Sequence, residues 1–200
     1  MRLPSLFAFI LTAALTASAF AQAPPTRIRG TVEKFDDHNL TVKSRDGHSV
    51  AVALAPDFTV RAVVAKTLAD IKPGDKVGIT SVKGADGVRK ALEVHIFPAS
   101  MTTVRLAESP WDLGPDSLMT NATVAQVSSA PQGRTVKVTL NGKESEITVP
   151  PDTPIVTYGP GDPSLLTPGA AVFVIARKQP DGGLTAAGVT AEKNGVKPPM

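Results

Sequence analysis

Histidine residues carry the most versatile chemistry in this sequence, and two of them have carboxylates nearby. His38 directly follows Asp36 and Asp37, and His95 lies two positions after Glu93. An Asp-Asp-His turn can present two oxygen ligands and one nitrogen ligand to a hard or borderline cation. The same residues also suit an ordinary hairpin turn, because Asp and Asn side chains hydrogen-bond to their own backbone. Two interpretations stay open, a plain turn and a metal site with His38, Asp37 and His95 as candidate ligands.

The pair Glu93 and His95 belongs to a predicted strand. Alternate residues of a strand point to opposite faces, so these two side chains share one face. The other face carries the aliphatic residues Leu92, Val94 and Ile96 and is expected to point into the core. We therefore expect Glu93 and His95 to form a solvated contact on the outer face.

A copper(I) site is a further option for the same histidine. Imidazole and thioether groups suit this soft ion, and His95, Met101 and Met119 could supply them. Methionines in a connecting segment more often serve as packing elements. The copper site is therefore an alternative to a packing role for the two methionines.

Other catalytic chemistry has no recognisable pattern here. The sequence has no cysteine, which excludes thiolate nucleophiles, thiolate metal ligands and disulfides. Neither the Gly-x-Ser-x-Gly elbow of hydrolases nor the His-Glu-x-x-His helix of metalloproteases occurs. No glycine-rich loop precedes a predicted helix, so the usual cradle for a nucleotide phosphate has no platform. We predict that the protein is not an enzyme and needs no cofactor.

Charge and aromatic content argue against nucleic-acid binding. The 200 residues carry a formal net charge of +3, with basic and acidic residues mixed along the chain, and only 4% are aromatic. A dedicated nucleic-acid binder usually concentrates Lys and Arg on one element and adds aromatic stacking platforms. We expect no nucleic-acid partner.

The N-terminal residues 1–21 have the features of a signal peptide. Arg2 supplies the positive charge, Leu6 to Leu15 is an apolar run, and Ala19-Phe20-Ala21 fits the small-residue rule for cleavage. We place the mature start near Gln22 and predict a periplasmic or secreted protein, with an uncleaved anchor as the alternative. No later run approaches the ~20 apolar residues that a spanning helix needs, so we expect no membrane span after cleavage.

A repeated frame of turn residues organises the rest of the chain. Three dipeptides recur in the second half: Pro56-Asp57 as Pro151-Asp152, Pro73-Gly74 as Pro168-Gly169, and Asp86-Gly87 as Asp181-Gly182. The shift is 95 residues each time (151 − 56, 168 − 73 and 181 − 86). A constant period of this length indicates two copies of one structural unit.

Each copy shows five or six short stretches of strand pattern separated by turn residues. Pro56-Asp57 is expected to end the third strand, and Thr67 with Asp70 predicts one helical turn. Strands at this spacing are typical of small barrels and sandwiches. We predict an all-β fold of two tandem OB-like Greek-key barrels, residues 26–98 and 121–193, with a proline-containing linker, 99–120, and a frayed tail, 194–200.

The linker contains the single tryptophan, Trp111. Its large apolar surface gains from burial, so we expect it to pack on one or both barrels and fix their relation. A purely local role, covering the edge of a core, is the alternative. If the protein binds a ligand, we predict a site in the groove between the barrels around Trp111, with Arg27, Arg29 and Tyr158 as polar or aromatic contributors.

A resemblance rests on two stretches between the β-units. They are Pro110-Trp111-Asp112-Leu113 and Met119-Thr120-Asn121-Ala122-Thr123-Val124. With them the chain resembles uncharacterised exported proteins of Gram-negative bacteria that carry OB-like domains of unknown function, over most of the mature chain. Some similar members carry automated labels as metal-transporter components. The resemblance implies the fold and an exported location, and it supplies no mechanism or site.

These observations predict an exported, non-enzymatic binding or envelope-associated module of unknown ligand. One alternative is a periplasmic accessory protein that handles metal ions. The other is a structural or assembly protein that binds an envelope component through a sheet edge. The expected partner is accordingly an envelope protein or a small ligand.

Overall fold

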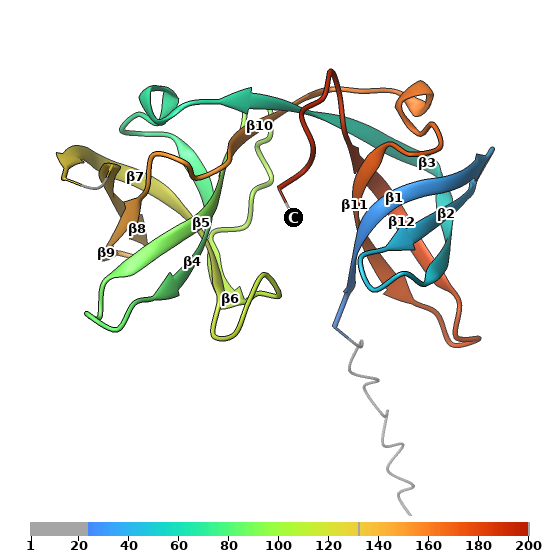
Figure 1. Ribbon diagram of the computed structural model, residues 1–200, viewed down its shortest axis with the longest axis horizontal. Helices are drawn as coiled ribbons and strands as arrows, with labels where there is room; N and C mark the ends of the chain where they lie inside the picture. The colour runs from blue at the N-terminus through green and yellow to red at the C-terminus, as the bar shows by residue number, and fades with distance from the viewer. Residues whose placement is uncertain (1–23, 132, 200) are drawn as a thin grey trace, which may run out of the picture.

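The computed structural model describes residues 24–131 and 133–199, where the regular structure is almost entirely β-strand (Figure 1). The strands are β1 (Thr26–Asp36), β2 (Asn39–Ser44), β3 (Ser49–Lys66), β4 (Lys76–Lys83), β5 (Arg89–Ile96), β6 (Ala107–Pro110), β7 (Leu118–Ala130), β8 (Gly133–Leu140), β9 (Lys143–Val149), β10 (Ile155–Pro160), β11 (Ala171–Lys178) and β12 (Leu184–Ala191). Two short 3-10 turns, η1 (Leu68–Asp70) and η2 (Pro163–Leu165), interrupt them. The all-β prediction is confirmed. The predicted signal peptide lies outside the described residues.

Local chemistry explains where strands and turns form. Val136 and Val138 on β8 are buried, while the residues between and beside them are only half-buried, as expected for a strand with one face in a core. The dipeptide Asn141-Gly142 has φ values of 51° and 77°, as a two-residue hairpin turn requires, and joins β8 to β9. The predicted helical turn is η1, where the Asp70 carboxylate accepts hydrogen bonds of 2.8 Å from the backbone N–H and the hydroxyl of Thr67.

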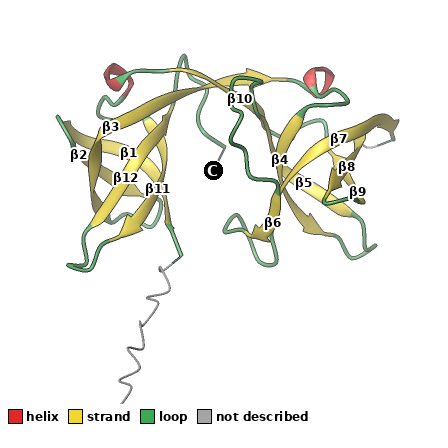
Figure 2. Cartoon of the chain, turned by 180° about the vertical axis from the view of Figure 1, so that it is seen from behind, coloured by secondary structure: helices red, strands yellow, loops and turns green. Residues whose placement is uncertain are grey.

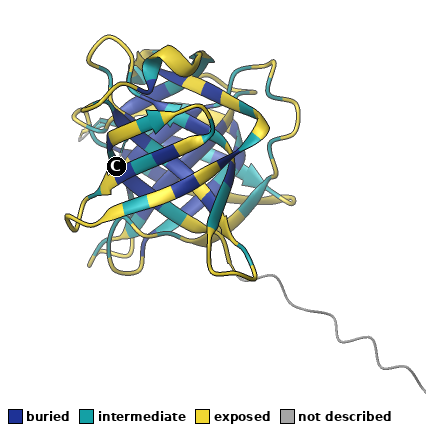
Figure 3. Ribbon diagram, turned by 90° about the vertical axis from the view of Figure 1, so that its right-hand side faces the viewer, coloured by how far each residue is buried: buried dark blue, intermediate teal, exposed yellow. Residues whose placement is uncertain are grey.

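Five strands close into a mixed β-barrel, which we call the first lobe. Antiparallel pairing joins β12, β11, β1, β2 and β3 in that order, and β12 closes the ring by pairing in parallel with β3. Aliphatic side chains from all five strands fill the barrel, among them Leu40, Val42, Val52, Val172 and Val174. Figure 3 looks at this lobe and shows buried residues along its strands and exposed ones at its turns.

A second group of five strands forms what we call the second lobe. Its strands pair in the order β5, β4, β7, β8 and β9, and β9 reaches back to β5 in parallel over two residue pairs. A separate core cluster includes Ile79, Val94, Val124, Val136 and Ile147. The short strand β6 is added to β7. Figure 2 shows the two lobes side by side, with β3 and β10 running between them.

The chain exchanges strands between the two lobes. β4 and β5 follow β3 in the sequence but pair within the second lobe, while β11 and β12 follow β10 and complete the first. Each lobe thus takes strands from both predicted units, residues 26–98 and 121–193, which corrects the prediction of one barrel for each unit. The physical reason is that each core cluster is complete only when apolar strands from both halves of the chain are present.

Strands β3 and β10 are the two segments that cross from one lobe to the other. β3 runs without interruption for 18 residues, so the prediction that Pro56-Asp57 ends the third strand is wrong. Proline lacks an N–H, and the ladder between β12 and β3 accordingly shifts register in this region, between Ala186 and Gly188. Beyond the shift, β3 pairs antiparallel with β10, from Arg61 opposite Pro160 to Lys66 opposite Ile155.

The exchange is reciprocal because equivalent elements recur at the period found in the sequence. β4 and β11 begin at residues 76 and 171, β5 and β12 at 89 and 184, and η1 and η2 at 68 and 163, so each pair is 95 residues apart (171 − 76, 184 − 89 and 163 − 68). The arrangement corresponds to a domain-swapped pair contained within one chain.

The segment after β12 turns back toward the centre of the molecule. Asn194 and Gly195 have φ values of 53° and 78°, and two backbone hydrogen bonds between Lys193 and Val196 close this turn. Pro198 beyond it is buried. Figure 1 shows the end of the chain between the lobes. The prediction of a frayed tail is therefore wrong for residues 194–199.

The exchange predicts where a core substitution acts. Ile79→Ala on β4 removes a fully buried side chain of the second lobe and should cost about 2 to 5 kcal/mol of unfolding free energy. Hydrogen exchange should show the largest loss of amide protection on β7 and β8, although these strands belong to the other half of the sequence.

The matched control is Val174→Ala, the equivalent position 95 residues later on β11. It should lower amide protection on β1 and β2 instead. Protection lost from β1 to β3 in the Ile79 variant, with β7 to β9 unchanged, would contradict the exchanged arrangement.

Candidate functional site

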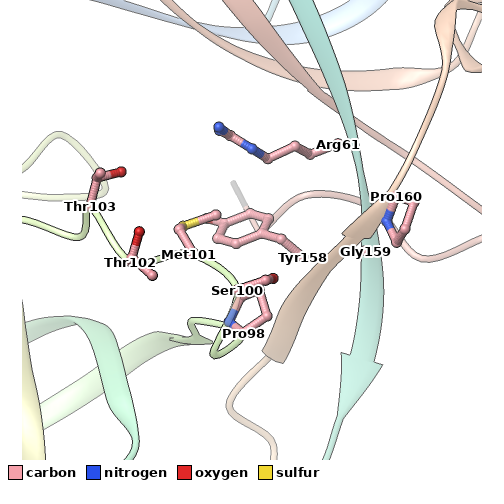
Figure 4. Close-up of a pocket in the computed structure, with 9 residues that line it drawn as sticks. All are labelled: Arg61, Pro98, Ser100, Met101, Thr102, Thr103, Tyr158, Gly159 and Pro160. Atoms are coloured by element: carbon pink, nitrogen blue, oxygen red, sulfur yellow. The ribbon is translucent and has the colours of Figure 1, made fainter.

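Three pockets between the lobes have one residue in common, Tyr158 on β10. Their volumes are about 340, 520 and 280 Å³. Arg61 and Met101 line the first two, and Phe97 and Phe173 line the last two. We call the three together the central groove, and the one of about 280 Å³ the inner pocket. Figure 4 shows the first pocket, with the Arg61 side chain close to the Met101 and Tyr158 side chains.

A chain of polar contacts leads from Tyr158 into the second lobe. The Tyr158 hydroxyl lies 2.6 Å from Nδ1 of His95, and Nε2 of His95 lies 3.4 Å from Oε2 of Glu93. The other Glu93 oxygen accepts a hydrogen bond of 2.6 Å from the Thr80 hydroxyl. Glu93 and His95 are only 2% and 8% exposed and line the inner pocket.

This burial overturns the prediction of a solvated contact between Glu93 and His95. The two residues do share a face of β5, but that face is covered. β10 pairs in parallel with β5 beside them, and the Tyr158 ring stacks on His95 with 5.5 Å between ring centroids. The sequence pattern of β5 could not reveal a cover that comes from a strand more than sixty residues away.

The protonation of Tyr158 makes its phenol a donor for the first hydrogen bond. Burial raises the pKa of this phenol well above the ordinary value near 10, the charge of Glu93 adds to the rise, and Arg61 opposes it. The phenol therefore keeps its proton, and the direction of the bond depends on the tautomer of His95. In the tautomer with the ring proton on Nε2, the phenol donates to Nδ1 and the Nε2 proton is on the side of Glu93.

Trp111 links the two lobes at the other side of the inner pocket. It lies in the loop that joins β6 to β7 of the second lobe, and its backbone N–H donates to the Ser117 carbonyl at 2.8 Å. The guanidinium of Arg27, on β1 of the first lobe, lies 3.9 Å from the centre of the indole. Phe173 on β11 approaches the same indole at 6.5 Å between ring centroids. The side chain thus contacts the lobe that does not carry it.

An ion pair between Arg29 of the first lobe and Asp112 of the second also connects the two lobes. Nη1 of Arg29 donates to Oδ2 of Asp112 at 2.6 Å, and the guanidinium lies 4.6 Å from the ring centre of Phe173. Arg29 is 7% exposed, whereas Asp112 is 41% exposed. A buried guanidinium needs a carboxylate nearby, because leaving it without a partner costs several kcal/mol.

Unpaired polar atoms concentrate in the inner pocket. Among the described residues, five buried side-chain atoms have no hydrogen-bond partner: Nε of Arg29, Nδ1 of His38, Nη2 of Arg89, Oε2 of Glu93 and Nε1 of Trp111. Three of them belong to residues that line the inner pocket, namely Arg29, Glu93 and Trp111. The 3.4 Å contact between His95 and Glu93 is an ion-pair distance and lacks hydrogen-bond geometry. Two N–H groups and one carboxylate oxygen of residues around this pocket are thus buried without a hydrogen-bond partner.

The candidate metal ligands are not brought together. Asp37 and His38 form the turn between β1 and β2 in the first lobe, where Nε2 of His38 lies 3.6 Å from the Asp37 carboxylate and its ring packs on Phe58. His95 lies on β5 of the second lobe. Within residues 24–131 and 133–199 no group of three His, Cys, Asp or Glu side chains is placed to hold a metal ion.

The three candidate copper ligands, His95, Met101 and Met119, do not line one pocket either. His95 and Met119 line the inner pocket, and the thioether sulfur of Met119 lies 3.8 Å from the Thr80 hydroxyl. Met101 lines the other two pockets of the central groove instead.

Three of the four predicted ligand-binding residues line the inner pocket. These are Trp111, Arg29 and Tyr158, while Arg27 lies over the indole of Trp111 and does not line the pocket. The other lining residues include Phe97, Phe173, Thr190 and Pro198, which were not predicted from the sequence as site residues, and Glu93 and His95, which were predicted only as a solvated pair with His95 as a candidate metal ligand. One signal was present, since Thr190 is the equivalent of His95 at the 95-residue period and lines the same pocket.

Comparison with protein families, with curated proteins and with solved structures finds no match to this chain. The resemblance to exported proteins with OB-like domains therefore stays a prediction. Within the described residues, no helix has the length and apolar character needed to cross a lipid bilayer.

The raised pKa of Tyr158 can be measured directly, because this is the only tyrosine in the chain. Ultraviolet absorbance should show no phenolate in the folded protein at pH values where the chain in urea titrates near 10. Because the folded state keeps a proton that the unfolded state loses, the contribution of Tyr158 to stability should be constant below about pH 9 and fall as the pH rises above about 10. Phenolate formation near pH 10 without unfolding would contradict the raised pKa of this phenol.

The ion pair at the junction predicts a difference between two carboxylate substitutions. Asp112→Ala leaves the buried Arg29 guanidinium without its carboxylate and should lower the unfolding free energy by about 1.5 to 3 kcal/mol. Glu144→Ala removes a carboxylate from an exposed pair with Lys137 and should cost less than about 1 kcal/mol. Urea denaturation of both variants measures the difference. Equal losses would show that Arg29 does not depend on Asp112.

Proposed function

We propose that this protein is an exported, non-enzymatic binding module that takes its ligand in the central groove between two OB-like barrels. The observation that carries the proposal is the set of three unpaired buried polar atoms on residues of one pocket. Buried polar groups in folded proteins are nearly always hydrogen-bonded, and an unpaired one costs about 1 to 3 kcal/mol. Three such groups around one pocket favour a site built for a partner.

The lining of the groove indicates the chemistry of that partner. Phe97, Tyr158 and Phe173 provide aromatic surface, and Ile175 adds an exposed aliphatic side chain. Arg61, exposed on β3, stands over the outer part of the groove (Figure 4). Sites of this kind bind a ligand through apolar contact and orient it through a few polar groups. A ligand with an apolar or aromatic body and an anionic or other acceptor group fits this lining.

The exported location in this proposal rests on the N-terminal residues 1–21, with their positive charge, apolar run and small residues. In that setting the partner is an envelope protein or a small ligand. The mixed charges give no support to a nucleic-acid partner. An assembly role in the envelope is compatible with the same groove, because a segment of another protein can carry the required groups.

The dye anilinonaphthalene sulfonate, an aromatic anion, tests the groove. It should bind the native protein and receive energy from the single tryptophan, Trp111, which lines the inner pocket. Arg61→Ala should weaken binding about tenfold, the effect of losing a contact worth about 1.4 kcal/mol.

The matched control is Arg105→Ala, since Arg105 is exposed and lines none of the three pockets. Its affinity for the dye should equal that of the native chain. Absence of dye binding to the native chain, or equal loss in both variants, would contradict a binding role of the groove.

A further inference from the structure

The last described segment of the chain lies between the lobes and forms part of the wall of the inner pocket. Pro198 and Pro199 line it together with Trp111, Tyr158 and Phe173. Pro198 is buried, whereas Lys197 before it is exposed. The Asn194-Gly195 turn directs the segment there from the end of β12. The two consecutive prolines thus border a pocket that is also lined by four aromatic residues, Phe97, Trp111, Tyr158 and Phe173.

Proline-rich segments suit such a pocket for two physical reasons. Their φ angles are fixed by the ring, so they lose little conformational entropy on binding, and they dock into grooves lined by aromatic side chains. A proline also has no N–H and contributes only a carbonyl acceptor to the backbone. The carbonyl acceptors of such a segment complement the two unpaired N–H groups on Arg29 and Trp111, residues that line the pocket.

Residues 194–199 provide no hydrogen-bond acceptor for the N–H groups of Trp111 and Arg29. Nε1 of Trp111 and Nε of Arg29 have no hydrogen-bond partner although Pro198 and Pro199 line the same pocket. The segment therefore packs beside the pocket without satisfying these two polar groups. A longer proline-rich chain, whose carbonyls reach both N–H groups, would gain two hydrogen bonds that the present occupant does not make.

We propose that the inner pocket is a docking site for a proline-rich segment of a partner polypeptide, and that residues 194–199 are its weak, displaceable intramolecular occupant. This inference rests on the proposed function, since it names the class of ligand for the same groove. The occupant lowers the apparent affinity for the partner by the fraction of molecules in which the pocket is filled.

The test uses the full chain and two synthetic peptides. One has the sequence of residues 193–199, and the other has alanine in place of both prolines. Trp111 emission reports binding to the native chain and to the double variant Pro198→Ser and Pro199→Ser. The variant should bind the proline peptide about tenfold more tightly than the native chain, because its own segment competes less. The alanine peptide should bind at least about tenfold more weakly than the proline peptide, since it lacks the fixed φ angles.

A second pair of prolines provides the matched control. Pro24 and Pro25 precede β1 and are exposed, so Pro24→Ser with Pro25→Ser should leave the affinity for the proline peptide unchanged. Failure of the Pro198 and Pro199 variant to bind the proline peptide, or equal binding of both peptides, would overturn the inference. The dye separates this outcome from failure of the groove itself, because a variant that binds the dye but neither peptide has a working groove with another class of ligand.

Discussion

The antiparallel pairing of β3 with β10 is the constraint on which the rest of the structure depends. Each of these strands leaves one lobe and delivers the next strands of its own half to the other lobe. Their pairing holds the two crossings together, and the backbone hydrogen bonds between them satisfy groups that would otherwise lie exposed on two free edges. Each core cluster accordingly contains side chains from both halves of the chain.

The central groove is a consequence of this crossing. Because β10 pairs with β3 on one side and with β5 on the other, Tyr158 lies over the face of β5 that carries Glu93 and His95. That cover converts a polar strand face into a buried one. A carboxyl group without water is costly unless it is hydrogen-bonded, and here the Thr80 hydroxyl satisfies only one of its two oxygens. The remaining oxygen lies 3.4 Å from Nε2 of His95 and has no hydrogen-bond partner.

Duplication supplied the shape of the groove, and divergence between the copies supplied its polarity. The positions equivalent to Glu93 and His95 are Gly188 and Thr190, so the second copy carries small and neutral residues where the first carries a carboxylate and an imidazole. The segments that follow β5 and β12 also diverged. The first became a linker carrying Met101 and Trp111, and the second became the turn and the two prolines. An almost symmetric scaffold thereby gained one distinct pocket.

The sequence by itself determined most of the strands and turns and the spacing of the two copies, because alternation of apolar residues and turn chemistry act over a few neighbouring positions. It also indicated Trp111, Arg29 and Tyr158 as neighbours, since a lone tryptophan between two units gains most from burial at their junction. It did not show that β3 continues past Pro56-Asp57. Only the tertiary structure decided which copy completes which core. Two similar units present similar strand faces, so the local pattern cannot distinguish pairing within a copy from pairing between copies. The burial of Glu93 and His95 and the position of Pro198 between the lobes follow from the pairing between copies. Both depend on contacts between segments far apart in the chain.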